Sequence, residues 1–168
     1  MTRHHHAVLI PAGLAPRTRE QAVNFVTSGS QWWQGRLARC SARPEELTAL
    51  ADRCETLAPD EQRLGFERTL RTLGDVALAP EGVAGDSDSL WVSLLADSGA
   101  YESAALALIP PSAAFSGGRL EDGRFSAQIV LPSGAGAHSR EAKSLAMAWL
   151  AALLRAVARE MIEERRLH

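Results

Sequence analysis

The residues with the clearest chemical potential lie just before the last apolar stretch of the chain. His138, Ser139 and Arg140 follow a glycine-rich connection, and Lys143 comes shortly after them. If Ser139 caps a helix, the free backbone N–H groups of the first turn and the helix dipole favour an anion there. This set therefore predicts an anion or phosphate site, although a plain loop followed by a helix cap accounts for the same residues.

A second set of residues favours contact with another protein. Trp32 and Trp33 are adjacent, so on a helix they point in different directions and at most one of them is centrally buried. The other is then an aromatic anchor for a partner, with Arg36 close to it. The connection over residues 113–124 is the other segment that we assign to partner contact. A wide amphipathic helix that buries both tryptophans is an equally good interpretation.

The remaining chemical groups predict no metal or catalytic centre. His4, His5 and His6 are consecutive and cannot all reach one ion with good geometry, so they indicate a frayed terminus or part of a tag. Cys40 and Cys54 lack the close spacing of a zinc motif and fit buried, reduced thiols. We therefore expect no cofactor and no enzyme. An enzyme that combines His138 with an acidic residue from the region 86–97 is a third hypothesis.

The composition bounds the class of protein. With 168 residues, of which 46% are hydrophobic and 23% charged, the chain can bury one core without disulfides. Its net charge of −2 lacks the basic excess typical of proteins that bind nucleic acids or anionic membranes. No signal-peptide pattern is present, and the apolar run 145–158 is too short to span a bilayer. We expect a cytoplasmic protein with no membrane partner.

The elements that position these groups begin with helices. Thr18 and Gln21 match a capping box that opens a helix over 19–40, which Gly29 can split into two. Pro44 and Pro59 suit first helical positions. The helices that follow them are predicted over residues 44–57 and 59–73. Glycine, proline and aspartate then predict a loop over 79–89.

Three strands are expected in the C-terminal half. The apolar run 90–95 and the segment 102–109 predict two strands joined by a tight turn, with a helix over 89–97 as the competing interpretation. Residues 124–131 alternate apolar and polar side chains, the pattern of an antiparallel strand with one solvated face. The glycine-rich connections on either side of this strand are residues 110–123 and 132–138.

The last element is the most regular. From Ser139 to about Arg165 apolar residues recur at helical spacing, with Glu141 near the start and arginines near the end, as the helix dipole favours. The sequence therefore predicts an α+β fold in which N-terminal helices precede a three-stranded antiparallel meander and a long C-terminal helix. We divide the chain into an arm (1–17), a helical region (18–78) and a sheet-and-helix region (79–168), packed as one domain.

From residue 59 onward, the order α-β-β-β-α and the run Ser139-Arg140-Glu141-Ala142-Lys143-Ser144-Leu145-Ala146 resemble double-stranded-RNA-binding domains. In that family a small polar cap and a basic, alanine-rich turn open the final helix. The resemblance implies nucleic-acid binding through the same four residues that predict the anion site. The family's lysine cluster is reduced here to Arg140 and Lys143, and Glu141 opposes them.

Two functions are therefore expected. The leading hypothesis is a non-enzymatic module that binds another protein as an adaptor, inhibitor or regulator, through the Trp32, Trp33 and Arg36 patch or through residues 113–124. The alternative is a nucleic-acid-binding protein. The sequence leaves the oligomeric state open, and a homodimer is compatible with it.

Overall fold

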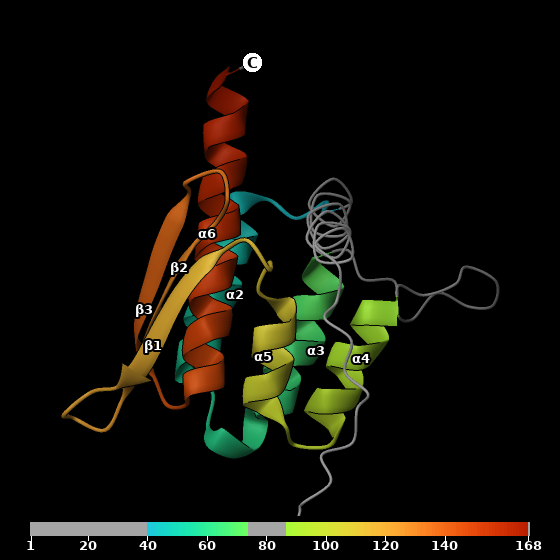
Figure 1. The fold of residues 1–168 in the computed structure, drawn as a ribbon, viewed down its shortest axis with the longest axis vertical. Helices are drawn as coiled ribbons and strands as arrows, with labels where there is room; N and C mark the ends of the chain where they lie inside the picture. The colour runs from blue at the N-terminus through green and yellow to red at the C-terminus, as the bar shows by residue number, and fades with distance from the viewer. Residues whose placement is uncertain (1–39, 74–86, 168) are drawn as a thin grey trace, which may run out of the picture.

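The computed structural model describes residues 40–73 and 87–167 of the chain (Figure 1). Its elements are, in order, α2 (Pro44–Thr56), a 3-10 turn η1 (Pro59–Glu61), α3 (Gln62–Thr72), α4 (Ser87–Asp97), α5 (Tyr101–Leu108), β1 (Ala114–Arg119), β2 (Phe125–Val130), β3 (Gly136–Ala142) and α6 (Leu145–Leu167). The expected α+β fold, with helices before a three-stranded antiparallel sheet and a long C-terminal helix, is confirmed. The helix predicted over 19–40, with Trp32, Trp33 and Arg36, lies outside the described residues except for its last residue, Cys40.

The C-terminal helix α6 is the centre of the core. In Figure 1 the sheet lies on one side of α6, α3 to α5 lie on the other, and α2 lies behind it. The helix packs against α2, all three strands and α5. From residue 146 to 158 every side chain except that of Arg155 is buried. A helix that is covered on several sides must be apolar around most of its circumference, which explains its broad apolar face.

The start predicted for this helix is wrong. The helix begins at Leu145, and Ser144 rather than Ser139 caps it, since the backbone N–H of Met147 donates to Ser144 Oγ at 3.3 Å. Residues 136–142 instead form β3. Two residues of β3, Arg140 and Glu141, lie opposite one residue of β2, which makes a β-bulge. The bulge interrupts the two-residue alternation of side chains, so the segment does not show a strand pattern in sequence.

The strands predicted at 90–95 and 102–109 are wrong, because these residues form α4 and α5. The competing interpretation of a helix over 89–97 fits α4. Helix α4 buries Val92 and Ala96 but leaves Leu90, Trp91 and Leu94 exposed, so its apolar run resembles a buried strand. The predicted tight turn is the link between the two helices, where Gly99 adopts a φ of 80°.

Strand β1 was also missed, because it falls within the connection predicted over 110–123. Its centre is Ser116-Gly117-Gly118, and these residue types are weak strand formers. Strand β1 belongs to the sheet because it pairs with β2, the strand whose sequence alternates apolar and polar residues. The helices predicted over 44–57 and 59–73 and the strand predicted over 124–131 are confirmed, with η1 forming the first turn of the second helix.

Candidate functional site

The predicted anion site is divided between two faces of the sheet. Ser139 is buried on the face that α6 covers, whereas His138 and Arg140 are exposed. Lys143 follows the end of β3 and is exposed. Because the last helix starts at Leu145, none of the four residues lies at the first turn as the prediction requires. The free N–H groups of a helix therefore do not gather these side chains around one anion.

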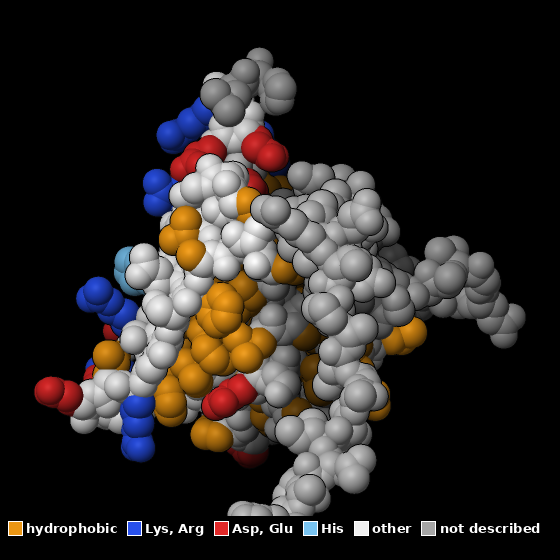
Figure 2. All heavy atoms as spheres, viewed as in Figure 1, with side chains coloured by type: hydrophobic (Ala, Val, Ile, Leu, Met, Phe, Trp, Pro, Cys, Tyr) orange, Lys and Arg blue, Asp and Glu red, His pale blue; other side chains and the backbone are white. Residues whose placement is uncertain are grey.

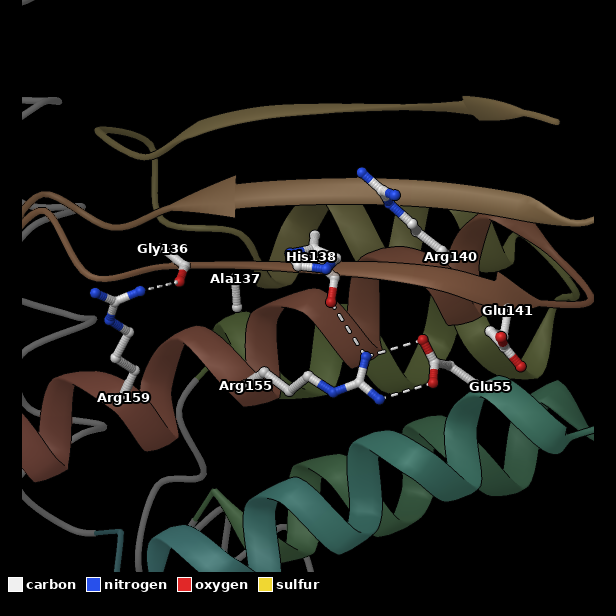
Figure 3. Close-up of a pocket in the computed structure, with 8 residues that line it drawn as sticks. All are labelled: Glu55, Gly136, Ala137, His138, Arg140, Glu141, Arg155 and Arg159. Carbon is white, nitrogen blue, oxygen red and sulfur yellow. Dashed lines mark hydrogen bonds and ion pairs between the residues drawn. The ribbon is translucent and has the colours of Figure 1, made fainter.

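Next to β3 the surface has a cleft of about 470 Å³, which is open to solvent (Figure 3). It lies between the free edge of β3 and the helices α2 and α6. The lining residues are Glu55, Gly136, Ala137, His138, Arg140, Glu141, Arg155 and Arg159. Among these, His138 and Arg140 are predicted from the sequence, whereas Glu55 and Arg155, which make the central contact, are not.

Glu55 and Arg155 form a two-pronged ion pair at the bottom of this cleft. Arg155 Nη1 donates to Glu55 Oε1 at 2.9 Å and Nη2 donates to Oε2 at 2.7 Å. The hydroxyl of Ser139 donates to Glu55 Oε1 at 2.5 Å, and Asp52 accepts a further bond from Arg155. The Glu55 side chain is only 11% exposed, so little water competes for it. Paired geometry of this kind is strong and directional.

The same side chains close the free edge of β3. Arg155 Nη1 donates to the carbonyl of His138 at 3.1 Å, and Arg159 Nη1 donates to the carbonyl of Gly136 at 3.3 Å. These backbone groups face away from β2, where another strand would otherwise pair. Polar groups that line the cleft thus seal a sheet edge, which gives them a structural role.

The hydrogen bonds in the cleft set the ionisation of Glu55. Burial alone would raise the pKa of this carboxyl, but the bonds from Arg155 and Ser139 outweigh burial and hold the pKa below its usual value of 4.5. Glu160 on α6 shows the opposite behaviour, since burial, with Glu164 and Glu163 nearby, raises its pKa. Folding therefore favours the charged form of Glu55 and the neutral form of Glu160.

Because the pKa values of Glu55 and Glu160 shift in opposite directions, we expect replacement of these two carboxyls to have opposite effects on stability. Because folding lowers the pKa of Glu55, its contribution is present at neutral pH and is lost as the pH falls from 4.5 through the lowered pKa. We expect Glu55→Gln to lower the free energy of unfolding at pH 7 and to flatten its fall in acid. Glu160→Gln should raise it at pH 7. Urea unfolding at neutral and acidic pH measures both, and a loss of stability in Glu160→Gln would contradict the assignment.

The other edge of the sheet, at β1, differs from the β3 edge. In the described residues β1 pairs with β2 alone and is exposed along its length except at half-buried Gly118. The N–H of Leu120 donates to the carbonyl of Arg124 at 2.7 Å, so Leu120 and Arg124 form a hydrogen-bonded pair. Since bonded and non-bonded pairs alternate in an antiparallel ladder, the backbone groups of Phe115, Gly117 and Arg119 point to the open edge.

An apolar surface adjoins this open edge. Figure 2 shows hydrophobic side chains gathered beside β1, over α6 and toward α5. Phe115 is 49% exposed, and its ring packs nearly perpendicular to that of Trp149 with ring centroids 6.1 Å apart. A Cβ on Gly117 would lie 2.8 Å from Trp149 Nε1 and 3.0 Å from Leu145 Cδ1, so glycine lets both side chains approach the strand. We call Phe115, Gly117, Leu145 and Trp149 the β1 patch.

The described residues carry no group of three or more His, Cys, Asp or Glu that could hold a metal ion. Burial raises the pKa of the Cys54 thiol to about 12, so this cysteine is not a ready nucleophile. Among the described helices, none combines the length and apolar character that crossing a membrane requires.

Comparison with known proteins supplies no relative. No protein family matches the chain, and neither curated proteins nor solved structures give a significant match.

Proposed function

We propose that the chain is a non-enzymatic module that binds another protein through the β1 patch. One observation carries the proposal: the two edges of the same sheet are finished in different ways. At β3, Arg155 and Arg159 of α6 donate to the free carbonyls, whereas in the described residues β1 pairs with β2 alone and adjoins apolar surface. An open edge beside exposed apolar side chains invites association, and proteins usually protect such edges.

Phe115 fits the role of an anchor for the partner. Its ring is half exposed, although it lies on the side of the sheet that faces α6. Trp149, which is 9% exposed, packs against the ring of Phe115 and holds it in place. Large aromatic side chains supported in this way contribute a large share of binding energy at protein interfaces. Residues 113–124, which the sequence assigns to partner contact, contain this anchor.

A pull-down from native cell extract, with and without nuclease, tests the proposal. The wild-type chain should capture a partner, and Phe115→Ser should bind it about thirtyfold more weakly, the loss expected for an aromatic anchor worth about 2 kcal/mol. The matched control is Gln128→Ser, because Gln128 is exposed on the opposite face of the sheet. This control should bind as the wild type does.

Circular dichroism should show that Phe115→Ser folds normally, since its side chain is half exposed. Equal capture by Phe115→Ser and the wild type would refute the proposal. Loss of capture after nuclease treatment would favour nucleic-acid binding instead. In that case His138→Ala and Arg140→Ala should weaken binding, with a steep dependence on salt.

A further inference from the structure

We propose that the partner contributes an extended peptide segment that pairs with β1 as a fourth strand. This segment carries apolar side chains at alternate positions and an acidic side chain opposite Arg119. The inference rests on the proposed function, because it names the chemistry that the β1 patch recognises.

The backbone of β1 supplies the first argument. Phe115, Gly117 and Arg119 present both their N–H and their C=O groups to the open edge, at alternate positions along one strand. An extended peptide carries the complementary set of donors and acceptors at the same spacing. Strand addition to an exposed edge is therefore the binding mode that satisfies these groups, and it needs no rearrangement of the three-stranded sheet.

The side chains of the β1 patch supply the second argument. Residues that lie directly opposite each other on paired strands point to the same face of the sheet. The peptide residues opposite Phe115 and Gly117 therefore face α6, where the apolar surface lies. Since Gly117 has no side chain, the peptide residue opposite it can reach toward Trp149. The intervening peptide residues face solvent, which gives the alternation.

Arg119 supplies the third argument. It is exposed at the end of β1, and no described carboxylate lies within ion-pair distance of it. Its neighbour Arg124, by contrast, is paired with Asp122 at 2.8 Å and with Glu141 at 3.4 Å. An acidic residue in the peptide opposite Arg119 would give this arginine the partner that it lacks among the described residues. Opposite charges across a strand pair stabilise the pairing.

A second copy of the chain fits this edge poorly. Strand β1 has the sequence Ala-Phe-Ser-Gly-Gly-Arg, with two central glycines and no acidic residue. Paired with itself, it would offer neither alternating apolar side chains nor a partner for Arg119. The described features thus favour a foreign peptide over self-association.

Phage-displayed random decapeptides, panned on the full chain and counter-selected on Phe115→Ser, provide the probe. We expect recovered sequences with alternating apolar residues and one acidic residue. Synthetic copies are then N-methylated one residue at a time. Methylation should weaken affinity at least tenfold at every second position, where the peptide N–H faces β1, and have little effect between. Bound peptide should slow hydrogen exchange at the amides of Phe115, Gly117 and Arg119.

Two variants at one position separate the backbone from the charge. Arg119→Pro removes an N–H that points to the open edge and leaves the bonds to β2 intact, so it should weaken every recovered peptide at least tenfold. Arg119→Gln keeps the N–H and should remove only the preference for the acidic residue. Circular dichroism and urea unfolding confirm that both variants fold. Equal binding by Arg119→Pro and Arg119→Gln would overturn strand addition.

The remaining outcomes are decisive as well. Peptides that require Phe115 but tolerate N-methylation everywhere would overturn strand addition and leave the proposed function standing. Failure to recover any peptide that distinguishes the wild type from Phe115→Ser would also overturn the inference, while the pull-down decides the proposed function separately. A concentration-dependent dimer that Arg119→Pro abolishes would identify a second copy as the occupant.

Discussion

Replacing Leu150 with alanine is expected to lower the free energy of unfolding by about 2–5 kcal/mol, the usual cost of removing a large buried side chain. Leu150 is fully buried in the middle of α6, which packs against α2 as well as the sheet. Because neighbours surround the helix, the surrounding residues cannot collapse into the cavity without moving a second element. Stability of this size is a large fraction of what a single domain has.

Urea unfolding followed by circular dichroism measures the change. Ile162→Ala is the matched control, since Ile162 lies further along the same helix and is 41% exposed. It should cost less than about 1 kcal/mol. If both variants lost equal stability, the central position of α6 in the core would be wrong.

Arg155→Met is expected to cost about 2–4 kcal/mol at pH 7, somewhat less than breaking a fully buried ion pair. Methionine preserves much of the length of the side chain but leaves the charge of Glu55 without its main partner. The carbonyl of His138 also loses its donor. The pKa of Glu55 should then rise, because burial is no longer outweighed by the guanidinium.

The double variant Glu55→Gln/Arg155→Met provides the control. It removes the unpaired charge of Glu55, so it should be more stable than Arg155→Met alone. The losses in the free energy of unfolding caused by the two single changes should not be additive. Urea unfolding at several pH values measures all three chains. A loss below about 0.5 kcal/mol for Arg155→Met would show that the pair behaves as an ordinary surface salt bridge.

The candidate site could be anticipated only in part. Arg155 is the single charged residue in the apolar run 145–158, and a charge among buried neighbours must find a partner. That pattern indicates an ion pair but does not identify Glu55, which lies 100 residues away in the chain. Residues 113–124 were assigned to partner contact from the sequence, and that assignment stays a prediction. Nothing in the sequence marks Phe115 as exposed or Trp149 as its support.

The sequence by itself determined the α+β class, two of the helices that precede the sheet, the strand over β2 and the body of α6. In these elements the apolar residues recur at the period of one type of secondary structure, so the local sequence pattern is sufficient to predict the element. The tertiary structure decided the rest. Strand β1 is a strand because β2 pairs with it, β3 contains a bulge that disrupts its alternation, and α4 exposes apolar residues that mimic a buried strand. Whether a sheet edge is sealed or open depends on residues distant in the chain, and that difference between β3 and β1 is the basis of the partner site that we propose at β1.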